Sequence, residues 1–498
     1  MSFVQFFKRY YYWLLLAILY AFIVFSPFLR GVQRVHDSYL IEIFGYAFLT
    51  HGIQDVSIDA LTSQGRPFSS LFYRALTAIN PPQTLIMSFS VLFSLIFFAF
   101  CSFLTMYMLH KYNVIKDSKV IAIIAFFGSI SLFFNMFILD SFLFYENWIM
   151  SAGSLFTVLA ILFFLKQGVV NYMASFILLL FGVFSYQASV AYFMPIIVLF
   201  LVAKHSSDFK QIVKYIFLAA AMYAAALLAN YGFILIVDSQ DVRVMGEIDF
   251  IANLRSIWQY IGYVLKSAMG FTTDYVFALF LCVFFVIIIV HNVKNKLYTK
   301  LLLLIFAAIC LVVAAMLPHL PMAVFYVMPR SAVSFAGIAG LLILCIVLSI
   351  KEKQRYIMLV MVFCGIFVIF IASIKLDAQK NNYANNMLDM QEISNIAMRI
   401  LEYERTTGID IIYMHTIMST QATSFRSELN NYHDITIRIL SVPWMIRPLI
   451  NNYLGRYFEA DWSISYYQYL NHDMLDHEMV FNYKRMLFVE DRLYLVIK

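Results

Sequence analysis

Long apolar runs separated by short polar gaps follow one another from near the start of the chain to about residue 374. Each run approaches the ~20 residues that an α-helix needs to cross the hydrocarbon core of a bilayer. The runs lack the apolar–polar alternation of outer-membrane barrel strands, so helices are expected. The pattern therefore predicts eleven membrane-spanning helices, near residues 11–29, 84–109, 119–139, 148–165, 171–185, 188–203, 213–237, 271–290, 301–317, 331–350 and 356–374.

The composition agrees with an integral membrane protein. Of the 498 residues, 62% are hydrophobic and only 13% are charged, and the mean hydropathy is +0.80. Water-soluble chains carry roughly 25% charged residues, so a soluble enzyme, a nucleic-acid binder and a disordered chain are all excluded. The five cysteines fall inside apolar runs, where they are expected to be core residues and not metal ligands.

The basic residues predict the orientation of the chain. With the N-terminus in the cytosol, the inner gaps carry fifteen Lys and Arg residues against three acids, as the positive-inside rule requires. An odd number of spans then places the C-terminus outside. The outer gaps carry eleven acids, and their cations are nearly all arginine, which suits phosphate binding better than lysine does. These cations are Arg30, Arg34, Arg66, Arg74, Arg243, Arg255, Lys266 and Arg330.

Three outer segments are longer than connectors need to be. The first, 30–83, predicts a helix over 38–49 and a second helix that opens at Gln64-Gly65-Arg66-Pro67 and ends before Pro81-Pro82. The second contains an amphipathic helix over 248–266 that is expected to lie in the membrane interface.

The third outer segment, 375–498, contains no run long enough to span a bilayer. It predicts an extracytosolic α/β domain with a helix near 392–403, a strand at 409–414 and a terminal hairpin over 485–497. The chain is thus expected to divide into a membrane domain, 1–374, and a soluble domain, 375–498.

Candidate chemistry is concentrated outside the spans. The spans themselves are almost free of ionisable residues, which argues against ion-coupled transport. The first outer loop holds Asp37, Asp55 and Asp59 together with Arg66. A carboxylate can act as a general base on a hydroxyl, and an Arg at a helix start can hold a phosphate. No residue cluster requires a metal or another cofactor.

Each of these features also has a purely structural interpretation. Asp37 stands just beyond a span, where a charge often only marks the membrane boundary. Gln64-Gly65-Arg66-Pro67 is also the signature of an ordinary helix start, and Met328-Pro329-Arg330 that of a stiff turn between two spans.

Several of these motifs together resemble the bacterial GT-C-type glucosyltransferases of the Gtr, serotype-converting kind, which glucosylate O-antigen and related surface glycans. The resemblance covers most of the chain. It rests on Asp37 after the first span, Gln64-Gly65-Arg66-Pro67, Phe184-Ser185-Tyr186-Gln187-Ala188, Tyr326-Val327-Met328-Pro329-Arg330 and the soluble tail. Asp37 is followed by Ser38 where many GT-C enzymes have a second acid, so no metal is expected.

The resemblance implies a GT-C-like membrane domain in the bacterial inner membrane that uses undecaprenyl-phosphate-glucose as donor and inverts the sugar carbon. A separate donor synthase and flippase would supply this lipid, and a lipid-linked or surface polysaccharide would be the acceptor. In this scheme Asp37 is the general base, and Arg66 and Arg330 hold the departing phosphate. Asp55 or Asp59 orients hydroxyl groups, while Tyr186 and Gln187 line the sugar site.

Two other functions remain open at this stage. An O-antigen polymerase is also a polytopic protein that handles lipid phosphates, although its large loop usually lies between spans and not at the end of the chain. A non-catalytic flippase or transporter is expected to carry charges within its spans or an inert first loop, and this sequence shows neither.

Overall fold

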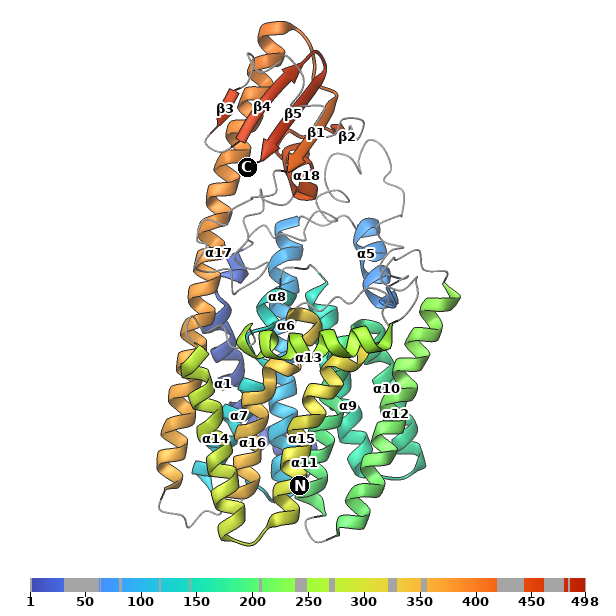
Figure 1. Cartoon of the computed structure of the whole chain (residues 1–498), viewed down its shortest axis with the longest axis vertical. Coiled ribbons are helices and arrows are strands. Elements are labelled where there is room, and N and C mark those ends of the chain that lie inside the picture. The colour runs from blue at the N-terminus through green and yellow to red at the C-terminus, as the bar shows by residue number, and fades with distance from the viewer. Residues whose placement is uncertain are drawn as a thin grey trace.

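The structure is a computed structural model that describes residues 2–30, 62, 64–79, 83–115, 118–142, 144, 146–205, 208–237, 249–267, 274–320, 329–350, 356–418, 443–460, 479–481 and 484–497. Most of its helices form one upright bundle, and a small sheet lies beyond one end of it (Figure 1). The bundle is built from α1 (Phe3–Phe25), α6 (Gln83–Lys111), α7 (Lys119–Phe133), α9 (Asn147–Lys166), α10 (Val169–Ser185), α11 (Phe193–Lys204), α12 (Phe209–Ile236), α14 (Asp274–Lys294), α15 (Tyr298–Met316), α16 (Ile338–Ser349) and the first part of α17 (Ile357–Thr407).

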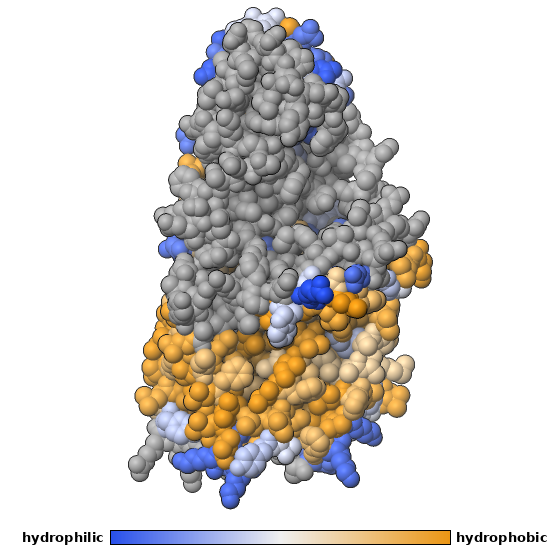
Figure 2. Space-filling model, viewed as in Figure 1, coloured by the Kyte–Doolittle hydropathy of each residue, from blue (hydrophilic) through white to orange (hydrophobic). Residues whose placement is uncertain are grey.

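The bundle has the surface of a helical membrane protein. Among the described residues, 7 helices are long and apolar enough to cross a membrane, and 4 shorter apolar helices accompany them. Figure 2 shows a hydrophobic belt around the lower half of the molecule, with hydrophilic residues below it. Large apolar side chains such as Phe217, Leu302 and Leu359 are about 70% exposed on this belt. Such a surface is typical of helices that face lipid acyl chains.

The helices occupy the stretches that hydropathy predicts, with local corrections. The first helix begins at Phe3 and not near residue 11, and it has a break in helical geometry at Tyr10. The run 119–139 is divided between α7 and the short α8 (Ile138–Ser141). The run 188–203 begins as the 3₁₀ segment η2 (Gln187–Tyr192) before α11 starts.

Close packing between α7 and α16 depends on glycine. A side chain on Gly340 would place its Cβ 2.2 Å from the backbone nitrogen of Leu132 and 2.6 Å from the carbonyl oxygen of Gly128. Small residues at such crossings let two helix backbones approach each other, which is how helices associate in a bilayer without a hydrophobic driving force.

Helix α13 (Phe250–Ser267) lies crosswise over the bundle helices (Figure 1), and it confirms the helix predicted at 248–266. Asp249 caps its start by accepting hydrogen bonds from the backbone N–H groups of Ile251 and Ala252. Asn253 faces inward and donates to the carbonyl of Leu320 at 2.9 Å, whereas Trp258 is 79% exposed. The apolar side chains of α13 are therefore divided, because Ile257 is buried against the bundle core whereas Phe250, Ile251, Leu254 and Trp258 are exposed.

Helix α17 is a single helix of 51 residues, which corrects the prediction of a span that ends at 374 and a separate helix near 392–403. It runs from the far end of the bundle to the sheet (Figure 1). Where the apolar run stops, the helix buries a polar stripe on one face, at the i, i+4, i+7 spacing of a continuous helix. The stripe consists of Lys375, Gln379, Asn382, Asn386 and Asp389.

The C-terminal strands form one five-stranded sheet in the order β2-β1-β5-β4-β3. They are β1 (Tyr413–Met418), β2 (Glu459–Ala460), β3 (Met479–Phe481), β4 (Lys484–Val489) and β5 (Arg492–Ile497). The antiparallel pair β4–β5 confirms the predicted hairpin, and β1 pairs with β5 in parallel. The strand expected at 409–414 begins only at Tyr413. A separate apolar core joins this sheet to α17 and α18 (Pro443–Leu454).

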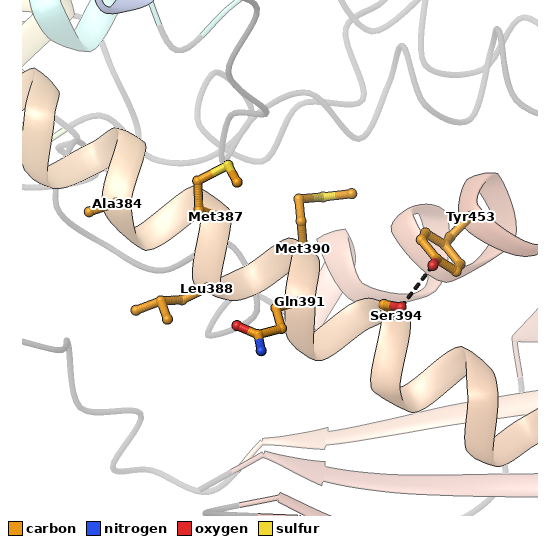
Figure 3. A pocket seen from close by; sticks show the side chains of 7 residues that line it. All are labelled: Ala384, Met387, Leu388, Met390, Gln391, Ser394 and Tyr453. Atoms are coloured by element: carbon orange, nitrogen blue, oxygen red, sulfur yellow. Dashed lines mark hydrogen bonds between the residues drawn. The ribbon is translucent and has the colours of Figure 1, made fainter.

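A groove of about 740 Å³ lies along α17 beside α18 (Figure 3). At this groove the Tyr453 hydroxyl lies 2.8 Å from the Ser394 hydroxyl. The groove is lined by Ala384, Met387, Leu388, Met390, Gln391, Ser394 and Tyr453.

Candidate active site

A tight turn at Gln64-Gly65-Arg66-Pro67 starts α5 (Pro67–Ile79), as the sequence predicts. The N–H of Gly65 donates to the carbonyl of Thr62 at 2.9 Å, and Gly65 has a φ of +76°, which glycine adopts without strain. Pro67 is the first helical residue, where a missing N–H costs nothing and the fixed φ suits a helix. Local sequence alone therefore explains how this segment folds.

Two side-chain amides from distant parts of the chain hold this turn in place. The Gln187 amide nitrogen donates to the carbonyl of Gln64 at 2.8 Å, and the Asn230 amide donates to the carbonyl of Gly65 at 2.9 Å. The amides also bond to each other at 3.2 Å. A Cβ on Gly65 would lie only 2.8 to 2.9 Å from the Gln187 and Asn230 side-chain amides. The turn, η2 and α12 thus meet in one close-packed contact, which we call the amide latch.

Arg66 follows the amide latch and stacks on an aromatic ring. Its Cζ lies 4.9 Å from the centre of the Tyr186 ring, a cation–π distance. Its Nε is buried and has no hydrogen-bond partner in the described part of the chain. The Ser69 hydroxyl, in the first turn of α5, is also buried and unpaired within the same residues. The start of α5 therefore presents buried donors without acceptors.

The turn that carries Arg330 also contacts η2. η4 (Pro329–Ala332) packs against η2 and against α8. Asn135 fixes the following residues, because its amide donates to the carbonyl of Val333 at 2.9 Å and to the Tyr192 hydroxyl at 3.0 Å. The short 3₁₀ turn that contains Arg330 is thus held against η2. The structure describes the backbone of Arg330 but not its side chain.

Two buried acids close to these elements have no role in the sequence interpretation beyond their charge. Asp140 is fully buried on α8, and Glu146 accepts a hydrogen bond from the Tyr73 hydroxyl of α5. Next to Glu146, the Asn147 side chain accepts a hydrogen bond from Ser94. The sequence did contain a signal for them, because Asp140, Glu146 and Asn147 lie between two apolar runs. Burying polar groups there is costly, so they are expected to have a structural or functional role.

Of the predicted site residues, the structure brings together Arg66, Tyr186 and Gln187, and it places the turn of Arg330 against η2. Asn230 is a further member of this group, and the sequence interpretation missed it. The three carboxylates expected in the first loop, Asp37, Asp55 and Asp59, lie outside the described residues, as does the helix predicted at 38–49. Within the described ranges, no group of three or more His, Cys, Asp and Glu side chains could hold a metal.

A comparison with family models supports a specific identity for this membrane protein. The family model of the glucosyl transferase GtrII matches residues 46–347, which is more than half of the chain. The chain belongs to this glucosyl transferase family. The matched region contains the amide latch, Arg66 and the Arg330 turn, whereas α17 and the C-terminal sheet follow it. No curated protein and no solved structure matches the chain.

Proposed function

We propose that the protein transfers glucose from undecaprenyl-phosphate-glucose to a surface glycan such as O-antigen, on the outer face of the bacterial inner membrane. The observation that carries this proposal is the cluster of Arg66, Tyr186 and Gln187 at the start of α5, within a GtrII glucosyl transferase chain. A lipid-linked donor suits the cluster because it lies at one end of a lipid-facing bundle (Figures 1 and 2).

In the proposed reaction the acceptor hydroxyl attacks the sugar carbon from the side opposite to the phosphate, so the configuration inverts. Asp37 takes the hydroxyl proton, and the electrons of the broken carbon–oxygen bond move to the lipid phosphate. Arg66 and Arg330 stabilise the charge that develops on that phosphate, which is typically the largest catalytic contribution. Asp55 or Asp59 orients hydroxyl groups of the sugars.

Tyr186 and Gln187 are proposed to line the glucose site. The Gln187 amide is already engaged by the backbone of the 64–65 turn and by Asn230, so its main contribution is to fix the wall beside Arg66. The Tyr186 ring supports the guanidinium from one face. Together these contacts preorganise the phosphate-binding Arg before the donor arrives.

We further propose that all eleven apolar helices cross the membrane, with the N-terminus in the cytosol and residues 375–498 forming an extracytosolic domain. The end of the bundle opposite the sheet supports this orientation. There, the last turns of α6, α9, α11 and α14 carry Lys111, Lys166, Lys204 and Lys294. Lys204 also donates to the carbonyl of Leu165 at 2.8 Å, so this lysine caps the end of α9 in addition to its proposed role in topology.

The proposed donor is made on the cytosolic face, so a separate synthase and a separate flippase must deliver it. The acceptor is then a polysaccharide that is lipid-linked or already at the surface. O-antigen modification of this kind changes the serotype of the cell.

The proposal is tested by structural analysis of the surface glycan from cells with and without the protein, and by transfer assays with purified protein. The expected result is one additional glucose per glycan repeat and transfer from polyprenyl-phosphate-glucose but not from nucleotide-glucose. An unchanged glycan, or use of the nucleotide sugar, would overturn the proposal. A glycan that differs only in chain length would indicate a polymerase.

A further inference from the structure

Two buried hydrogen-bond donors lie at the start of α5, one just before its first residue and one in its first turn, and the described protein satisfies neither. One is the Nε of Arg66, and the other is the hydroxyl of Ser69, a residue with 0% exposure. Buried donors are nearly always paired in folded proteins, so two of them within one helical turn require an explanation.

These two donors lie within one turn of each other at the helix start. Arg66 and Ser69 are three residues apart, a spacing that places side chains side by side on a helix. The N–H groups of Phe68 and Ser69 belong to the first turn, where no intrahelical acceptor exists, and Pro67 has no N–H. The helix start therefore combines a guanidinium, a hydroxyl and two backbone N–H groups, together with the positive end of the helix dipole.

Every group in this set is a donor or positively charged, so the complementary ligand is an anion. No carboxylate in the described ranges forms an ion pair with Arg66. The carbonyls of Gln64 and Gly65, which precede Arg66 in the chain, already accept hydrogen bonds from the amides of Gln187 and Asn230. A phosphate group, with several acceptor oxygens, can satisfy all these donors at once.

We propose that the start of α5 is an oxyanion pocket for a phosphate ester, in which the Ser69 hydroxyl and the first-turn N–H groups bind phosphate oxygens beside Arg66. The identification of that ester as polyprenyl phosphate rests on the proposed function. When the bond between sugar and phosphate breaks, the phosphate changes from a diester to a monoester and gains negative charge. The pocket therefore binds the departing product more tightly than the donor, and it lowers the barrier to transfer.

The test is equilibrium binding of polyprenyl phosphate and of uncharged polyprenol to the full-length protein in nanodiscs. Ser69→Ala is compared with Ser70→Ala, which changes the adjacent buried serine. The N–H group of Ser70 donates to the carbonyl of Arg66. Because a hydroxyl bound to a charged oxygen is lost, the Kd for polyprenyl phosphate is expected to rise about tenfold in Ser69→Ala. Polyprenol binding is expected to be unchanged, and Ser70→Ala is expected to behave as the wild type.

The pocket is overturned if Ser69→Ala weakens polyprenyl phosphate and polyprenol equally, or weakens neither. Competition with inorganic phosphate distinguishes two sources of the ligand. Displacement of the lipid shows that the pocket accepts soluble phosphate, and retention shows that it is specific for the lipid.

The transfer rate, measured on the same preparations, separates this inference from the proposed function. If the protein transfers glucose but Ser69→Ala does not change its affinity for polyprenyl phosphate, the pocket is rejected and the proposed function stands. If the affinity for polyprenyl phosphate depends on Ser69 but the protein transfers no glucose, the pocket stands and the proposed function is rejected.

Discussion

The side-chain amide of Gln187 donates a hydrogen bond to the backbone carbonyl of Gln64 across 123 residues of sequence, at 2.8 Å. This bond joins η2, the 3₁₀ segment between α10 and α11, to the turn that starts α5. It also sets Tyr186, the preceding residue, beneath the guanidinium of Arg66. Among the described residues, the Arg66 guanidinium is thus positioned by the Tyr186 ring and by the bonds that hold the preceding turn.

Gly65→Ala is expected to disrupt this arrangement and to lower the transfer rate at least about tenfold. Alanine at a φ of +76° is strained by roughly 1–2 kcal/mol, and its Cβ would collide with the amides of Gln187 and Asn230. Gly232→Ala is the matched control, because nothing lies within 4 Å of that position and alanine favours a helix. Transfer and protein level in the membrane are measured for both. A wild-type rate for Gly65→Ala would show that the amide latch is dispensable.

Tyr186→Leu is expected to reduce transfer up to about tenfold, whereas Tyr186→Phe retains most of it. The reason is that phenylalanine keeps a ring beneath the Arg66 guanidinium, and leucine removes the cation–π contact, which contributes about 0.5–2 kcal/mol. The measurement is the transfer rate at saturating acceptor for both variants. Equal losses would assign the effect to the hydroxyl and contradict support by the ring.

Asp37→Asn is expected to lower transfer by about 100- to 10,000-fold, the usual contribution of a general base, while the protein level is maintained. Asp249→Asn is a matched control, since asparagine also caps a helix start and α13 should be preserved. Normal glucosylation by Asp37→Asn would reduce Asp37 to a boundary charge. Asp55, Asp59 and the buried Asp140 would then be the next candidates.

A reporter enzyme that works only outside the cytosol is expected to be active when it is fused after Lys498. A reporter that works only in the cytosol is expected to be inactive at the same position. The prediction follows from the lysines at the last turns of α6, α9, α11 and α14, because basic residues at span ends are enriched on the cytosolic side. A fusion placed after Lys204, in a truncated chain, should give the opposite pattern. Activity of a cytosolic reporter at Lys498 would contradict this topology, and would mean that the orientation or the number of spans differs from the proposal.

Hydropathy predicts most of the bundle because each span must present apolar side chains to lipid. It fails for α17, where Lys375, Gln379 and Asn382 interrupt the apolar run and yet the helix continues. A helix satisfies its backbone hydrogen bonds internally whatever its side chains are. Whether a polar stripe ends a helix or is buried by the rest of the fold depends on contacts that one segment does not reveal.

The candidate site likewise contains some residues that local sequence predicts and one that only long-range contacts place. Gly65 and Pro67 impose a turn and a helix start through local backbone preferences, so the sequence predicts them. Asn230 is one amide within an apolar run, and its partner Gly65 is 165 residues away. Its position in a span was the only hint of a role, since a polar group there needs a partner.

The most direct test of phosphate binding by Arg66 and Arg330 is a double-mutant cycle on the rate of transfer from a defined polyprenyl-phosphate-glucose in detergent. Lysine keeps the charge but not the planar donor fork, so Arg66→Lys and Arg330→Lys should each reduce the rate strongly. If both arginines hold one phosphate, the double variant loses much less than the product of the two fold-losses. Strict additivity of the two effects in free energy, or a wild-type rate for Arg330→Lys, would contradict a shared phosphate.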